Sequence, residues 1–227
     1  MKTQDNQAKQ AVGFAAAEMV QEGMLVGLGT GSTAAFFIQR LGQRCVEGLK
    51  IKCVATSVHS WKLGEQNCLS MIDMSGITRI DLTVDGADEI DHDKNMIKGG
   101  GGALLREKIL ASISHEMLVV VDSGKVVQHL GAFPLAVEVV DFGCDATIEQ
   151  IRNLQLLPKR RVKDGKAFVT DGGNCIVDID LSKEHRKLFD IDRALRQLPG
   201  VVETGYFSGL AGRVLIGHED GRVEMWD

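Results

Sequence analysis

Apolar residues in the first part of the chain alternate between helical spacing and short continuous runs. Residues 12–20 have helical spacing and predict an amphipathic opening helix that ends near Glu22 and Gly23. Short apolar runs predict buried strands, with helices between them. The predicted strands are residues 24–28, 51–55, 69–74, 81–84 and 117–121, and the predicted helices are residues 34–43, 57–66 and a later helix that carries Glu107. This alternation indicates an α/β fold with a doubly wound, mostly parallel, Rossmann-like sheet.

The pattern changes near Pro134, where a second kind of organisation begins. The predicted order there is strand 137–140, helix 145–154, a hairpin of 167–170 with 175–179, helix 191–198 and strand 201–206. Strand-helix-strand-strand-helix-strand is the order of a ferredoxin-like α+β unit. A closing hairpin, 214–217 with 223–226, would add edge strands to the first sheet. We therefore expect a Rossmann-like domain of residues 1–131 plus 207–227 and an inserted ferredoxin-like domain of residues 132–206.

Composition is that of an ordinary globular protein. The 227 residues are 44% hydrophobic and 25% charged, and the net charge of -5 argues against a nucleic-acid partner, which would favour a basic stripe. Five cysteines without C-x-x-C spacing indicate reduced thiols. The sequence shows no signal-peptide core and no apolar run near the roughly 18 residues that a membrane span needs. We expect a cytoplasmic protein with no membrane partner.

A loop rich in glycine and hydroxyl groups, residues 29–33, joins the first predicted strand to a helix. Backbone N–H groups beside glycines and at a helix N-terminus bind anions. A dinucleotide fingerprint would need a third glycine where Ser32 stands, and a Walker A loop would need Gly-Lys-Ser/Thr. A monophosphate bound by Thr30, Gly31, Ser32 and Thr33 is the favoured interpretation, and a turn that only connects strand and helix is the alternative.

Residues 81–110 hold the densest group of chemically active side chains. Asp85 and Asp88 follow a predicted strand, where open α/β sheets bind ligands, and Lys98 precedes four glycines. Glu107 lies in the next helix, where burial would make its carboxylate a stronger base. The two aspartates can bind sugar hydroxyls or pass a proton between oxygens, and Lys98 can stabilise negative charge beside a carbonyl. Lys125, which follows the strand at 117–121, is a candidate anion ligand.

Metal chemistry is not predicted. Asp91, Asp93 and Asn95 begin like an EF-hand loop, but Met96 and Gly102 stand where that loop requires glycine and glutamate. The histidines show no paired ligand spacing. A base, an oxyanion stabiliser, hydroxyl-binding acids and a phosphate loop together suit isomerisation of a sugar phosphate through an enediolate.

These motifs resemble those of the ribose-5-phosphate isomerase A family. The matching blocks are Gly29 to Thr33, Val84 to Ile90, Lys98 to Leu104 with Arg106 to Lys108, Asp122 and Ser123 with Lys125, and Phe133 to Leu135 before Val137 to Val139. The resemblance implies interconversion of D-ribose 5-phosphate and D-ribulose 5-phosphate in the non-oxidative pentose phosphate pathway. It also implies that no metal or organic cofactor is needed and that the protein is a homodimer or homotetramer.

The resemblance further implies residue roles. Glu107 is similar to the family's proton acceptor, and Asp85, Asp88 and Lys98 resemble its other catalytic groups. The implied substrate-binding residues are Thr30, Gly31, Ser32, Thr33, Asp85, Gly86, Ala87, Asp88, Lys98, Gly99, Gly100, Gly101 and Lys125. Leu105 replaces the threonine common in the family, which removes a hydroxyl from the helix entrance. Two functions remain as alternatives to the isomerase: a non-catalytic sugar-phosphate sensor and a sugar-phosphate deaminase of the same architecture.

Overall fold

The computed structural model describes residues 2–227, with side chains from residue 6 onward. Its contacts divide the chain into two compact units. The first unit comprises Met1–Ala87, Arg106–Val126 and Gly209–Asp227, and the second comprises Asp88–Leu105 and Val127–Ser208. The domain boundaries that the sequence suggests remain a prediction. They place residues 88–105 in the first domain, whereas the contacts of these residues group them with the second unit.

The first unit is built on a six-stranded sheet with the order β15-β14-β6-β3-β1-β2. Its strands are β1 (Leu25–Leu28), β2 (Lys52–Ala55), β3 (Ile80–Asp85), β6 (Ser114–Asp122), β14 (Val214–Gly217) and β15 (Val223–Trp226). All neighbours are parallel except the edge pair β14 and β15. The predicted doubly wound sheet and its closing hairpin are therefore confirmed.

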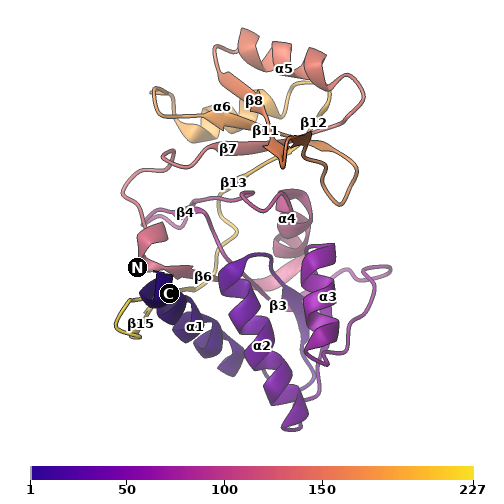
Figure 1. Ribbon diagram of the computed structural model, residues 1–227, viewed down its shortest axis with the longest axis vertical. Coiled ribbons are helices and arrows are strands. Elements are labelled where there is room, and N and C mark those ends of the chain that lie inside the picture. The colour runs from indigo at the N-terminus through magenta and orange to yellow at the C-terminus, as the bar shows by residue number, and fades with distance from the viewer. Residues whose placement is uncertain (1) are drawn as a thin grey trace. The chain divides into compact units, whose positions relative to one another are not determined.

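Helices cover both faces of this sheet because its strands are apolar on both sides. The helices are α1 (Lys2–Glu18), α2 (Ser32–Val46), α3 (Val58–Gln66) and α4 (Leu104–Ile113), with a short 3₁₀ helix, η1 (Ser123–Lys125). Side chains of α1 and α2, such as Val12 and Phe37, share one core with Val26 and Leu118. Leu110 of α4 packs in a separate cluster with β2 and β3 residues. In Figure 1, α1, α2 and α3 lie side by side.

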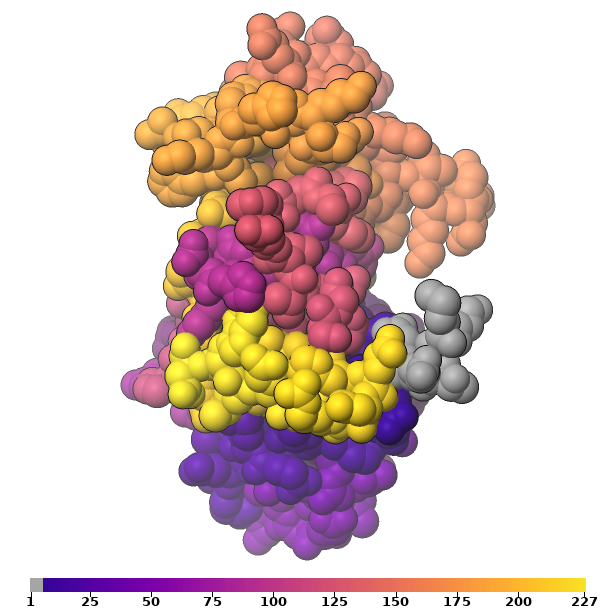
Figure 2. Space-filling model, turned by 90° about the vertical axis from the view of Figure 1, so that its left-hand side faces the viewer, coloured from indigo at the N-terminus to yellow at the C-terminus, as the bar shows by residue number. Residues whose placement is uncertain are grey.

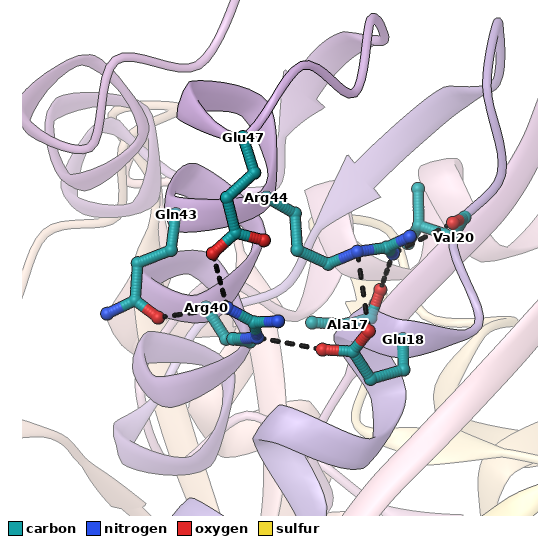
Figure 3. A network of polar contacts seen from close by, with 7 residues as sticks. All are labelled: Ala17, Glu18, Val20, Arg40, Gln43, Arg44 and Glu47. Carbon is teal, nitrogen blue, oxygen red and sulfur yellow. Dashed lines mark hydrogen bonds and ion pairs between the residues drawn. The ribbon is translucent and has the colours of Figure 1, made fainter.

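A polar network joins the C-terminal end of α1 to α2 (Figure 3). Arg44 donates to the carbonyl oxygens of Ala17 and, at 2.9 Å, Val20. Arg40 Nε donates to Glu18 Oε1 at 2.7 Å, and its Nη1 donates to Glu47. Cations suit the carbonyl end of a helix, so Arg44 satisfies carbonyl groups that the end of α1 exposes, while Arg40 pairs with carboxylates on both helices and links them.

The C-terminal strands pack beside the N-terminal helix at the edge of the first sheet. Strand β14 lies so close to α1 that a Cβ added at Gly217 would stand 2.3 Å from the carbonyl oxygen of Ala8. Figure 2 shows the C-terminal residues, in yellow, as one continuous surface next to indigo residues of the N-terminal part. Only a glycine permits this backbone approach.

The second unit contains a four-stranded antiparallel sheet with the order β12-β7-β11-β8. Its elements are β7 (Leu135–Val139), α5 (Cys144–Asn153), β8 (Leu157–Arg160), β11 (Cys175–Asp180), α6 (Leu188–Leu195) and β12 (Val201–Thr204). Both helices share one core with the sheet, in which Ile148 and Ile191 pack with Val137 and Val177. The strand-helix-strand-strand-helix-strand order confirms the ferredoxin-like prediction, but its second strand is β8 and not the predicted strand 167–170.

Small sheets complete the second unit. Three short strands pair in the order β13-β5-β4, and two more form a pair, β10 with β9. Their bounds are β4 (Glu89–Ile90), β5 (Met96–Ile97), β9 (Val162–Lys163), β10 (Lys166–Ala167) and β13 (Tyr206–Phe207). Across the described residues, no helix is long and apolar enough to cross a membrane.

Two predicted elements were wrong. The predicted strand 69–74 forms only an isolated bridge between Met71 and Cys53, because the chain turns where Ser75 N donates to Asp73. The predicted hairpin of 167–170 with 175–179 is reduced to a bridge between Val169 and Cys175. Strand β11 pairs with β7 on one side, and on the other side β8 takes the positions from Val177 to Asp180, so only Cys175 is left to pair with Val169.

Candidate active site

Residues 29–33 lie at the sheet edge where the parallel strands of the first unit end. Strand β1 ends at Leu28 and α2 begins at Ser32, with Gly31 as its N-cap. Gly31 has a φ of 128°, which a side chain would strain. No described side chain caps α2, so the loop offers the N-terminal N–H groups of the helix to an anion. This geometry fits the predicted phosphate loop.

A cluster of hydroxyl groups surrounds Thr30 of this loop. The sequence predicted only part of this cluster. Thr30 Oγ1 lies 2.7 Å from Thr56 Oγ1, 2.8 Å from Ser57 Oγ and 3.0 Å from Ser60 Oγ. Ser57 accepts from the N–H of Ser60 and caps α3. Ser60 Oγ donates to the carbonyl oxygen of Gly29 at 2.6 Å. The sequence signal that was missed is Ser60. It lies one helical turn after Ser57, and Thr56 and Ser57 already place two hydroxyls at the end of β2.

Asp85, the last residue of β3, is fully buried beside the same loop. Its Oδ1 accepts from the N–H groups of Thr30 at 3.0 Å and Gly86 at 2.8 Å. A Cβ at Gly29 would stand 2.3 Å from that oxygen, which explains the glycine there. Two predicted site elements, the carboxylate and the loop, are thus in direct contact.

Glu107 and Lys125 belong to neighbouring elements of the first unit. Glu107 lies in the first turns of α4 and is only 4% exposed, so its predicted burial is confirmed. Helix α4 leads into β6, which is parallel to β3, so the helix begins toward the edge where β3 ends. Lys125 lies in η1, directly after β6, and Asp122 caps η1 through a hydrogen bond from Gly124 N. Both therefore belong to the sheet edge that carries Asp85.

Asp88 and Lys98 belong to the second unit. Asp88 Oδ2 accepts from the N–H of Gly100 at 2.8 Å, so this acid is fixed to the glycine loop. Lys98 is 3% exposed, its N–H donates to Gly205, and its ammonium group stands 5.4 Å from the ring centre of Phe207. Such a cation-π contact holds the charge of a buried lysine. Within this unit Asp88 is thus bonded to the glycine loop, and Lys98 directly precedes that loop in the chain.

The glycine loop, residues 99–102, follows Lys98 directly. Gly99 and Gly102 have φ values of 113° and 76°, and Gly102 N donates to Gly99 O at 2.9 Å. Leu105, where the family commonly has threonine, is half-buried. Across the described residues, no three or more histidine, cysteine or acidic side chains are placed to hold a metal ion.

Comparisons with known proteins agree with these features. Residues 52–221 match the family model described as ribose 5-phosphate isomerase A (phosphoriboisomerase A). Ribose-5-phosphate isomerase A of Bacillus mycoides is 44% identical over 216 residues, covering 95% of this chain and 98% of that protein.

Solved structures agree as well. Ribose 5-phosphate isomerase from Plasmodium falciparum has a TM-score of 0.94 at 32% identity, covering 98% of both chains. A structure of D-ribose-5-phosphate isomerase in complex with phospho-erythronic acid has a TM-score of 0.90 at 32% identity, covering 97% of both chains. With the acid blocks, the glycine loop and the buried glutamate in place, the chain belongs to the ribose 5-phosphate isomerase A family.

Proposed function

We propose that this protein interconverts D-ribose 5-phosphate and D-ribulose 5-phosphate through an enediolate. The observation that supports this most directly is the first unit's sheet edge, where a buried Asp85 is bonded to the loop of Thr30 and a buried Glu107 lies on α4. A solved relative is described in complex with phospho-erythronic acid, a phosphorylated sugar acid. The comparisons favour neither the sensor nor the deaminase alternative.

The proposed chemistry moves one carbon-bound proton and one oxygen-bound proton. Glu107 removes the C2 proton of the aldose and returns it to C1, which turns the C1 carbonyl into an alcohol carbon. The O2 proton passes to O1 as C2 becomes the carbonyl, and Asp85 and Asp88 are the proposed groups for this transfer and for binding hydroxyls. Lys98 stabilises the negative oxygen of the enediolate.

Substrate binding is proposed for the residues that match the family motif. Thr30, Gly31, Ser32, Thr33 and Lys125 would hold the phosphate, because they offer backbone N–H groups, hydroxyls and a cation. The backbone of 85–88 and of 98–101 would contact the sugar. The reaction needs no cofactor, since proton transfer and charge stabilisation suffice. We also propose a place in the non-oxidative pentose phosphate pathway, a cytoplasmic location and a homodimeric or homotetrameric assembly.

The substitution Glu107→Gln tests the assignment of the base. A positioned base contributes roughly 10² to 10⁴ in rate, so kcat should fall at least about a hundredfold while the fold is kept. Glu149→Gln, on the exposed side of α5, is the matched control and should leave kcat unchanged.

Loss of the C2 hydrogen of ribose 5-phosphate in deuterated water, followed by NMR, is the direct measurement. Wild-type protein should exchange this hydrogen, and Glu107→Gln should exchange it at least about a hundredfold more slowly. Folded wild-type protein that binds ribose 5-phosphate without exchange would instead indicate a sensor. Near-normal turnover in Glu107→Gln would show that another group is the base.

A further inference from the structure

The glycine loop 99–102 has no side chains of its own, so its conformation depends on groups that contact its backbone. Gly99 and Gly102 have positive φ, and an unconstrained glycine loses more conformational freedom on ordering than any other residue. Within the second unit, Asp88 binds one N–H of the loop. The opposite side of the loop is held by a residue that the motif comparison did not identify, Arg161.

Arg161 Nη1 donates to two consecutive carbonyl oxygens of the loop, Gly99 O at 2.7 Å and Gly100 O at 3.2 Å. The same guanidinium binds Asp178 with two bonds, from Nε at 2.9 Å and from Nη2 at 2.5 Å. The side chains of Arg161 and Asp178 are only 14% and 25% exposed. A paired, two-bond Arg-carboxylate contact has a fixed plane, so it presents Nη1 to the loop in one orientation.

The arginine is itself held in place by the sheet of the second unit. Arg161 follows β8 directly, and its N–H donates to Ile176 O on β11, the strand that also carries Asp178. The Phe168 ring centre lies 5.8 Å from the guanidinium carbon. A Cβ at Gly102 would stand 2.4 Å from that ring, so the same phenylalanine borders the loop. Arg161, Asp178 and Phe168 therefore contact one another beside the glycines, and we call these three residues the Arg161 cluster.

The Arg161 cluster contacts the peptide plane between Gly99 and Gly100. The peptide bond between Gly99 and Gly100 gives its carbonyl oxygen to Arg161 and its N–H to Asp88. Because a trans peptide is planar, with these two groups on opposite sides, fixing the oxygen also fixes the direction of the N–H. The orientation of the Asp88 carboxylate thus depends on Arg161, although the two side chains bind opposite ends of this plane.

We propose that Arg161 is a positioning residue for the reaction: it orients the Gly99–Gly100 peptide and, through it, the carboxylate of Asp88. Its action is through the backbone of the loop and not through substrate. This inference rests on the proposed isomerase function, in which Asp88 and the glycine loop act on the sugar. Phe168 and Asp178 serve to hold the guanidinium plane.

The variants Arg161→Ala, Arg161→Lys and Asp178→Asn test this role. Arg161→Ala should lower kcat/KM about 10- to 100-fold, the effect expected for lost hydrogen bonds to a charged group, with the loss mainly in kcat. Arg161→Lys should recover little of this activity, because one ammonium group cannot make two bonds to the Asp178 carboxylate and also bind the Gly99 carbonyl oxygen. Added guanidinium ion should restore part of the activity of Arg161→Ala. Arg152→Ala, which removes an exposed arginine paired with Glu149, is the matched control and should show neither loss nor rescue.

Amide hydrogen exchange gives a readout that does not need turnover. In Arg161→Ala and Asp178→Asn, peptides covering 98–105 should exchange faster than in the wild type, while peptides of β6 stay unchanged. Unchanged exchange at 98–105, or full activity in a folded Arg161→Ala, would overturn the proposal. A wild type without isomerase activity would refute the proposed function alone, and the exchange result would still decide whether Arg161 orders the loop.

Discussion

Removal of the Ser60 hydroxyl tests whether the cluster behind residues 29–33 stabilises the first unit. Ser60 is 1% exposed, its Oγ donates to Gly29 O at 2.6 Å, and the same atom lies 3.0 Å from the hydroxyls of Ser57 and Thr30. In Ser60→Ala the Gly29 carbonyl loses this donor. Thr30 and Ser57 lose one neighbour but keep each other at 2.8 Å. The Gly29 carbonyl therefore loses a donor, and the Ser57 hydroxyl, which accepts from Thr30, loses the acceptor of its own hydrogen.

Loss of one partner from a buried hydrogen bond costs about 1 to 3 kcal/mol, and about 2 kcal/mol is our central value. For a chain of this size, about 1 kcal/mol moves the unfolding midpoint by roughly 2 to 4 °C, so we expect a fall of about 4 to 8 °C. Because the loop also carries the proposed phosphate site, KM for ribose 5-phosphate should rise more than kcat falls.

Thermal unfolding by calorimetry, with steady-state kinetics on the same samples, provides the test. Ser112→Ala is the control, because Ser112 Oγ donates to Ile109 O at 2.8 Å on an exposed helix face. Its stability should stay within about 0.5 kcal/mol of the wild type. A Ser60→Ala midpoint within about 1 °C of the wild type would refute the argument that this buried hydroxyl stabilises the loop.

Two further predictions concern stability. Phe37→Ala should lower the free energy of unfolding by about 3 to 5 kcal/mol in urea titrations, because Phe37 is fully buried in the first unit's core. Phe142→Ala, at a 93% exposed position, should change it by no more than about 0.5 kcal/mol, and equal effects would contradict the assigned core. The hydrogen bonds from Arg213 hold the pKa of Glu116 in the folded protein below its usual range. The pair therefore stabilises the fold fully at a pH above the pKa that Glu116 has in the unfolded chain. This stabilisation is lost as the pH falls through the lower pKa of the folded state. The unfolding midpoints of the wild type and Glu116→Gln should therefore converge from pH 7 toward acid, and a constant difference would contradict the pairing.

The candidate site was predicted mainly where its chemistry is local in sequence. Asp85, Lys98, the glycines and Glu107 all fall within residues 81–110, and Asp85 itself ends a strand of the parallel sheet, where such sheets bind ligands. Ser60 and Arg161 were missed because their partners are distant in sequence. Ser60 binds Gly29 across 31 positions, and Arg161 binds Gly99 across 62.

By itself, the sequence determined the alternation of strands and helices, the ferredoxin-like order of the second part and the residues that follow strand ends. These features depend on hydrophobic periodicity, capping and glycine, which act between near neighbours in the chain. Only the tertiary structure decided that β8 takes the free edge of β11, that three hydroxyls gather around Thr30 and that Arg161 holds the Gly99 carbonyl. Those outcomes depend on strand register and on packing between segments that are distant in the chain. Several segments could pair with the same strand edge, and each buried polar group needs a hydrogen-bond partner.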